Sequence, residues 1–262
     1  MRTCTRAVGH ILLLASAMAV AAVASADTTI SFTGDDNGNG MMEVSNGKVR
    51  MSSPGEQGYM LFEAGANQFI AVNEKDSNYL VFDQAQVEKI ARMQEQLQQQ
   101  MEQQLAGMPP GQREQMRQMM SRMMPKMPGG EAKPRRYQRG GTSKVGRYSC
   151  EVLEVYVGDR KASEQCVVGR DDLDIPDDDF ETIRAMQSFM VDLANSFAMM
   201  SDQIMDYGEP GRDEIPVRYV HYNKILGEVV GELEQISHDA IPPERFEIPA
   251  GFEQQQLPEM KF

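Results

Sequence analysis

The sequence is poor in the residue types that most catalytic and metal sites need. It has no tryptophan, and only three histidines and three cysteines among 262 residues. It contains no Gly-x-Ser-x-Gly sequence, which disfavours a serine hydrolase. It contains no Cys-x-x-Cys pair either, which disfavours a thiol redox centre or a zinc site. We therefore expect a non-enzymatic protein without a cofactor.

One long apolar run stands near the N-terminus. Two positive residues, Arg2 and Arg6, precede the apolar residues 11–23, and a small-x-small cleavage site comes directly before Asp27. This order is that of a cleavable secretory signal. The run is shorter than the roughly 20 residues of a membrane-spanning helix, so an uncleaved anchor is the less favoured alternative. The sequence predicts a signal peptide over 1–26 and a mature protein in the periplasm.

The remaining chain is strongly acidic. The full sequence has a formal net charge of -13, and loss of Arg2 and Arg6 with the signal makes it -15. Such a charge disfavours nucleic acid and anionic membrane surfaces as partners. No second long apolar run follows the first, so we expect no transmembrane segment after signal cleavage.

Two cysteines remain after cleavage, and their surroundings predict a disulfide. Cys150 and Cys166 lie in two strand-like segments at equal distances from Gly158, which begins a turn. A hairpin at that turn would place the two cysteines opposite each other. Closing such a loop contributes about 3 kcal/mol to stability in an oxidising compartment. A redox or metal pair is the alternative, and no nearby histidine supports it.

Hydrophobic patterning predicts an antiparallel sheet joined to helices. Short runs of β-branched and aromatic residues alternate with turn residues such as Asn46-Gly47, the strongest short hairpin signal. The predicted strands are 28–33, 41–44, 48–51, 59–62, 68–72, 78–82, 149–157, 163–168, 216–222 and 228–237. Helical periodicity predicts helices over 84–106, 111–124 and from 177 onward. The last begins at Asp177-Asp178-Asp179, acids well placed at a helix N-terminus, and its apolar residues form a stripe at spacings of three and four.

The domain prediction follows from these elements. Proline and glycine residues over 128–143 are typical of a mobile linker. We expect a single α+β domain over 27–262, with a Gln/Met-rich helical insertion and linker at 84–142.

Several segments together resemble a known family. They are 46–51, 78–82, 146–152, 164–167 and 245–252. In these segments the chain is similar to exported bacterial proteins of the domain of unknown function 4412 family. The resemblance implies a distant similarity in fold to periplasmic lipoprotein carriers. We therefore expect a curved antiparallel sheet of about seven to nine strands, a half-barrel with Met-rich helices packed on one face.

Methionine is the most unusual feature of the composition, with 21 residues. Methionine is an adaptable apolar residue that suits a ligand of irregular shape, although a stripe of such residues is also how any helix packs on a sheet. We predict a pocket for an apolar small molecule or lipid, or for a lipidated partner. The predicted ligand-binding residues are Met93, Leu97, Met101, Met186, Met190 and Phe197.

Two alternatives to this pocket stay open. Six methionines are concentrated on a predicted helix: Met116, Met119, Met120, Met123, Met124 and Met127. Thioethers are soft ligands, so this cluster could hold Cu(I) or Ag(I). Alternatively, the chain is a structural envelope module that docks a protein through its Gln/Met-rich helix.

Overall fold

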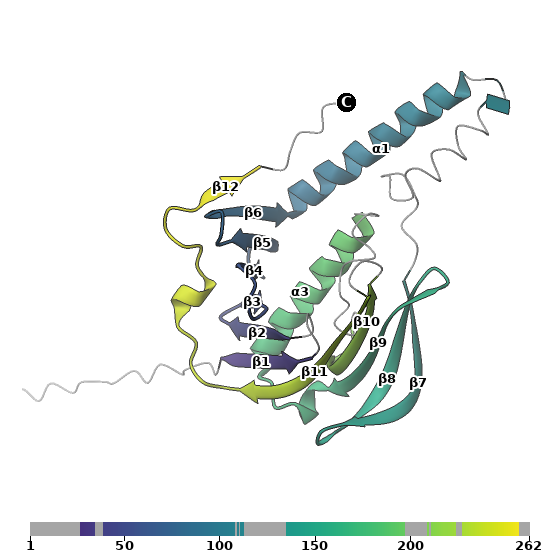
Figure 1. The fold of residues 1–262 in the computed structure, drawn as a ribbon. Helices are drawn as coiled ribbons and strands as arrows, with labels where there is room; N and C mark the ends of the chain where they lie inside the picture. The colour runs from purple at the N-terminus through teal and green to yellow at the C-terminus, as the bar shows by residue number, and fades with distance from the viewer. Residues whose placement is uncertain are drawn as a thin grey trace, which may run out of the picture.

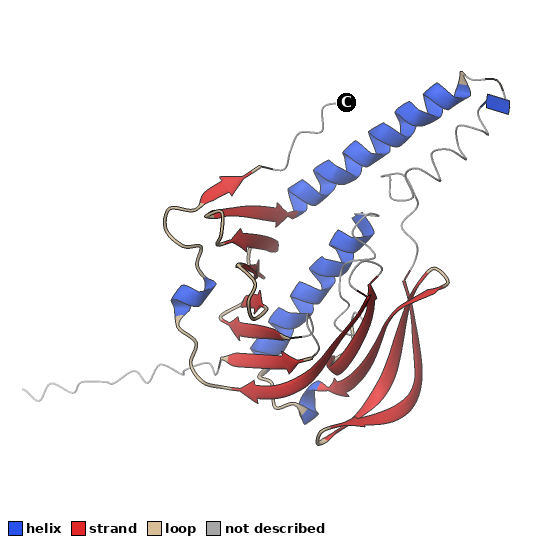
Figure 2. Ribbon diagram, in the orientation of Figure 1, coloured by secondary structure: helices blue, strands red, loops and turns tan. Residues whose placement is uncertain are grey.

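The structure is a computed structural model of the chain (Figure 1). It describes residues 27–34, 39–107, 109, 111–112, 135–196, 209, 211–223 and 227–256. The described part is dominated by one open sheet of twelve strands, with two long helices beside it (Figure 2). The predicted α+β class with a large antiparallel sheet is confirmed, and the sheet has more strands than expected.

Six consecutive strands form the first half of the sheet. They are β1 (Thr28–Thr33), β2 (Gly40–Ser45), β3 (Lys48–Ser52), β4 (Gly58–Glu63), β5 (Gln68–Asn73) and β6 (Asn78–Asp83). Each pairs antiparallel with the next. Asn46 and Gly47 form the β2–β3 turn with φ angles of 49° and 74°, as a type I′ hairpin requires. The predicted meander is confirmed.

The second half of the sheet comes later in the chain. Its strands are β7 (Arg135–Val145), β8 (Tyr148–Val157), β9 (Arg160–Gly169), β10 (Glu214–Asn223) and β11 (Gly227–Ser237), and β12 (Glu253–Gln255) pairs parallel with β6 at the far edge. The strand order is β12-β6-β5-β4-β3-β2-β1-β11-β10-β9-β8-β7. The two halves join where β1 pairs with β11, with Ile30 opposite Ile236.

Both long helices begin with favourable N-terminal groups. Helix α1 (Gln84–Ala106) is capped by Asp83, whose carboxylate accepts a hydrogen bond from the N–H of Gln86 at 2.7 Å. Helix α3 (Asp177–Ser196) carries three aspartates in its first turn, where the helix dipole stabilises negative charge. The sheet bends around α3, while α1 starts from β6 and extends beyond the sheet (Figure 1).

One face of α3 forms the centre of the main core. Ile183 and Met186 are at most 1% exposed, as the predicted stripe at spacings of three and four residues requires. The ring of Phe189 lies 5.5 Å from that of Phe69 and 6.0 Å from that of Phe62. Such aromatic pairs stabilise beyond the area they bury. The helix is thus fixed against the first half of the sheet.

The C-terminal segment covers the outer face of that first half (Figure 1). A second core forms there from Tyr59, Leu61, Ile70, Val72, Ile241 and Phe246. Glu43, 4% exposed, accepts hydrogen bonds from Arg245 of the segment and from Arg50 of β3, the latter at 3.0 Å. A buried carboxylate between two guanidinium groups holds the segment to the sheet.

The start of β1 contacts elements far along the chain. The carboxylate of Asp27 accepts a hydrogen bond from the N–H of Ile241 at 2.6 Å, and the hydroxyl of Thr28 donates one to Asp179 of α3 at 2.6 Å. Burial raises the pKa of Asp179, and this effect outweighs the hydrogen bond from Thr28, which lowers it. Residues 27 and 28 therefore tie together β1, α3 and the C-terminal segment.

Strand β7 differs from the prediction, because most of it was expected to belong to the linker. It pairs with β8 and contains a register shift between Arg139 and Thr142, so the Gly140-Gly141 pair makes a bulge and does not end the strand. Arg139 donates to Glu151 at 2.7 Å and to Glu214 at 2.5 Å. These contacts, first the hydrogen bond that Arg139 donates to Glu214, raise the pKa of Arg139. Tertiary contacts therefore order a segment whose composition is that of a linker.

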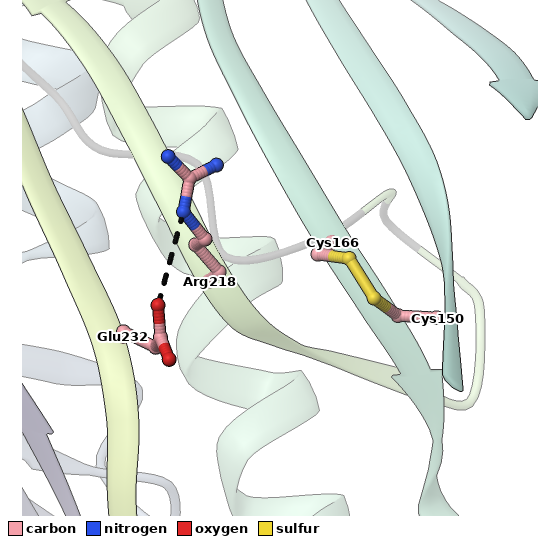
Figure 3. Close-up of a disulfide and its surroundings, with 4 residues drawn as sticks. All are labelled: Cys150, Cys166, Arg218 and Glu232. Atoms are coloured by element: carbon pink, nitrogen blue, oxygen red, sulfur yellow. Dashed lines mark ion pairs between the residues drawn. A yellow bond between two sulfur atoms is a disulfide. The ribbon is translucent and has the colours of Figure 1, made fainter. Parts of the chain in front are cut away.

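The predicted disulfide between Cys150 and Cys166 is present (Figure 3). The cysteines are not directly opposite each other. The two-residue turn at Gly158-Asp159 offsets them by one position, and a register shift between Val155 and Tyr156 adds a second, which places Cys166 opposite Val152. They form a diagonal pair, and their Cα atoms are 5.3 Å apart, within the usual range for a disulfide. Figure 3 also shows the ion pair that joins β10 to β11 nearby.

Candidate functional site

A cavity of about 780 Å³ lies between the first half of the sheet and the last turns of α3. Its apolar lining includes Phe32, Met42, Met51, Met60, Ala71, Phe82, Met190, Leu193 and Tyr219. Small-molecule sites in proteins measure about 300–1,000 Å³ and are mostly apolar with a few polar groups. The cavity therefore has the size and the chemistry of a ligand site.

Methionines from three neighbouring strands form the floor of the cavity. Met42 of β2 is opposite Met51 of β3, and Met51 is opposite Met60 of β4. The row continues to Ala71 of β5, whose small side chain leaves space beside the methionines. Unbranched thioether side chains change rotamer easily and adapt to different apolar shapes. This floor suits a flexible ligand better than a rigid one.

Tyr219 of β10 forms one wall of the cavity together with Phe32. Their ring centroids are 5.6 Å apart. The Tyr219 ring lies directly over Gly231 of β11, since a Cβ atom at Gly231 would come within 2.3 Å of the ring. A glycine inside a strand often marks such a close approach. Burial raises the pKa of the Tyr219 phenol, so the wall is neutral at physiological pH.

Helix α3 covers the cavity with its C-terminal part. Met190 and Leu193 line it, and they stand three residues apart on one face of the helix. Met186, one turn earlier, is 0% exposed and belongs to the packed core. The cavity thus begins where the close packing of α3 on the sheet ends.

The polar groups of the lining lie at one end of the strands. They come from the loop before β2, from the β3–β4 turn and from the β5–β6 turn. These residues are Asn39, Ser52, Ser53, Glu56, Gln57, Asn73 and Lys75. The cavity therefore has an apolar interior and a polar rim, an arrangement that fits an amphipathic molecule.

The residues predicted from sequence fall into three groups. Met190 lines the cavity, and Met186 lies in the core beside it. Met93, Leu97 and Met101 lie on α1, which contacts α3 and β6, but their side chains are outside the described part. Phe197 and the six methionines of the metal alternative, Met116, Met119, Met120, Met123, Met124 and Met127, lie outside the described residues.

Sequence reasoning missed the methionines of the strands. The Asn46-Gly47 turn could have predicted two of them. Met42 and Met51 are at equal distances from this turn, so they must pair in a two-residue hairpin. Period-two alternation also places both on the same face as the buried Val44 and Val49. The missing information was that a helix from the far end of the chain covers this face.

The described residues contain neither a cluster of metal-binding side chains nor a helix suited to a bilayer. Within 27–256, apart from the gaps in the described ranges, no group of three or more His, Cys, Asp or Glu residues is placed to hold a metal ion. No helix in the same part of the chain is both long and apolar enough to cross a bilayer.

Comparisons with known proteins place the chain in a family. No curated protein matches it. A crystal structure of an uncharacterized conserved protein from Thermus thermophilus is similar with a TM-score of 0.41 and 6% identity, over 88% of this chain and 91% of that one. The family model described as Domain of unknown function (DUF4412) matches residues 112–252, more than half of the chain. The protein is a member of the DUF4412 family.

Proposed function

We propose that this protein is a non-enzymatic, exported binding protein that holds an apolar, lipid-like molecule in the cavity beneath α3. The observation that carries the proposal is the methionine-floored cavity of about 780 Å³ between the sheet and the helix. The N-terminal signal pattern supports export to the periplasm.

The lining chemistry favours binding over catalysis. The interior surface consists of thioether, aliphatic and aromatic groups, and its buried phenol, Tyr219, has a raised pKa. A general base or nucleophile works best when its pKa lies near the operating pH, which a buried neutral phenol does not offer. Burial of an apolar ligand, in contrast, stabilises a complex by about 25 cal/mol per Å² of apolar surface removed from water.

We further propose that the curved sheet encloses the ligand in the way proposed for the half-barrel of periplasmic lipoprotein carriers. Helix α3 would then cover the ligand from the inner face of the sheet. The ligand would be an acyl chain, free or attached to a lipidated partner. Adaptable methionines support this function, because acyl chains differ in length and unsaturation.

Native mass spectrometry of the protein purified from the periplasm tests the proposal. We expect a mass excess the size of one lipid, and we expect solvent extraction to remove it. A protein that has the bare polypeptide mass, and that also fails to bind a fluorescent fatty acid after extraction, would contradict the proposed function.

A matched pair of variants connects the binding to the cavity. Met51→Gln with Met60→Gln introduces amides of similar size into the floor, and we expect fatty-acid affinity to fall at least tenfold. Val81→Gln with Ile248→Gln places two amides in the second core on the opposite face of the sheet, outside the lining, and should leave affinity within twofold. Equal losses in both variants would place the ligand elsewhere.

A further inference from the structure

The rim of the cavity carries a defined pair of opposite charges. Among the lining residues that the structure describes, Lys75 is the one cation and Glu56 the one carboxylate. Lys75 belongs to the β5–β6 turn and Glu56 to the β3–β4 turn. Both are exposed, and neither has a side-chain ion pair or hydrogen bond within the described ranges.

A backbone contact ties the two turns together. The N–H of Glu74, next to Lys75, donates to the carbonyl of Gln57, next to Glu56, at 3.0 Å. The β5–β6 turn is further ordered by Asn73, whose amide donates to Asp76 at 2.8 Å. The positive and negative groups are therefore held on adjoining turns at the same end of the apolar cavity.

The charge around this rim favours a ligand that carries a cation as well as an anion. Lys75 stands between Glu74 and Asp76, so the β5–β6 turn has an excess of negative charge despite its lysine. A headgroup with only negative charge would meet one ammonium and three carboxylates. A headgroup with both charges can place its anion at Lys75 and its ammonium at Glu56, so that each charge of the rim meets a charge of opposite sign.

The volume limits the apolar part of the ligand. At about 30 Å³ per methylene, close to the share of a water molecule in the liquid, one hexadecanoyl chain needs roughly 500 Å³ and two need roughly 1,000 Å³. The cavity of about 780 Å³ holds one such chain in full, and its volume matches one chain better than two.

We infer that the preferred ligand is a single-chain amphiphile with a zwitterionic headgroup, its phosphate at Lys75 and its ammonium at Glu56. The inference rests on the proposed apolar-ligand function and adds the chemical class of the headgroup. The acyl chain supplies most of the affinity, and the headgroup supplies selectivity, because exposed charge pairs contribute little beside the burial of an apolar chain.

Calorimetric titration of the mature, extracted protein tests this inference with two probes that share one acyl chain. They are palmitoyl-lysophosphatidylethanolamine, which is zwitterionic, and palmitoyl-lysophosphatidylglycerol, which is anionic. We expect the zwitterion to bind about fivefold more tightly at low salt and the ratio to shrink at high salt. Glu56→Lys should abolish or reverse the preference, because it replaces the carboxylate of the rim by a second ammonium.

Glu244→Lys is the matched control. Glu244 is exposed in the turn of 3-10 helix at Pro243–Phe246, on the segment that covers the opposite face of the sheet. It makes the same change in net charge as Glu56→Lys and should keep the wild-type preference. Equal affinity of the wild type for both lysolipids overturns the headgroup inference and leaves the proposed function intact. Failure to bind either lysolipid or palmitate overturns both.

Discussion

The Tyr219 wall of the cavity can be displaced by adding one methyl group to the strand beneath it. A Cβ atom at Gly231 would lie 2.3 Å from Cζ, 2.4 Å from the hydroxyl oxygen and 2.6 Å from Cε1 of Tyr219. Ordinary contacts of this kind are 3.4 Å or longer. Gly231→Ala therefore requires the ring to move by about 1 Å or more, a change of the overpacking type.

The expected loss of stability in Gly231→Ala depends on the space into which the Tyr219 ring can move. Tyr219 is 7% exposed and contacts the ring of Phe32, so it cannot lift from β11 without disturbing the core or entering the cavity. Overpacking of a close-packed site costs about 1–3 kcal/mol. For a chain of this length that corresponds to a fall in Tm of about 2–12 °C. A ring moved into the cavity also removes ligand space, so fatty-acid affinity should fall in the same variant.

Thermal and urea unfolding of Gly231→Ala measure this effect against two references. Gly140→Ala changes a strand glycine with nothing within 4 Å of the new Cβ, and its stability should stay within about 0.5 kcal/mol of wild type. In a Tyr219→Val background the cost of Gly231→Ala should fall below about 0.5 kcal/mol, because the two residues then no longer compete for space. A cost that is small in the wild type, or unchanged in that background, would refute this account of the wall.

Three further predictions concern stability. Replacing Cys150 and Cys166 by alanine should lower the free energy of unfolding by about 3 kcal/mol in urea titrations, and a loss below about 1 kcal/mol would contradict a stabilising role. Glu43→Gln should lower the free energy of unfolding by about 2 kcal/mol, because two guanidinium groups lose their carboxylate. Proteolysis near Arg245 should become faster, and an unchanged cleavage rate would argue against Glu43 as the anchor of the C-terminal segment. Asp179 has a raised pKa, so the folded state binds more protons than the unfolded state, and stability should fall as pH rises from about 4. Asp179→Asn should therefore stabilise the protein at pH 7 more than at pH 4, and the opposite order of the two gains would be incompatible with a buried carboxylate.

Local signals predicted most of the sheet. The strands of the first half are short runs rich in apolar residues, separated by turns such as Asn46-Gly47, so their positions depend on neighbours in sequence. The same is true of the Cys150–Cys166 pairing, although the bulge that makes it diagonal has no sequence signature. The start of α3 followed from its three aspartates and its regular stripe.

The elements that were missed depend on distant partners. Strand β7 has charged residues and glycines where a core strand has apolar ones, and its order comes from contacts such as Arg139 with Glu214 of β10. An edge strand needs only one neighbour and tolerates such a composition. Strand β12 has three residues and pairs parallel to β6, far from it in the chain. The β12 pairing could not be inferred from a local pattern, whereas β7 is joined to β8 by the two-residue turn at Gly146 and Arg147, and its charged composition concealed it.

The ligand site that the sequence predicted stays a prediction; of its residues whose side chains the structure describes, Met190 lies in the lining of the cavity and Met186 in the core. The sequence indicated that methionines would form an apolar pocket beside α3, and Met190 lines the cavity. The strand methionines Met42, Met51 and Met60 were absent from the prediction, because an inward-facing residue in a strand becomes a ligand contact only if the helix above leaves space. That space is set by the packing of α3, which depends on the whole sheet.

The pairing of β1 with β11 also sets the order in which the molecule can fold. Each of the strands β1 to β6 pairs with a strand that is adjacent in sequence. Ile30 of β1, in contrast, also pairs with Ile236, which is near the other end of the chain. Contacts between residues so distant in sequence raise the contact order and slow folding. The meander can therefore form early, while α3 and the cavity beneath it can be completed only when the last strands arrive. A chain released before β11 would expose the unpaired edge of β1 and the methionine floor together, which are the conditions that favour aggregation.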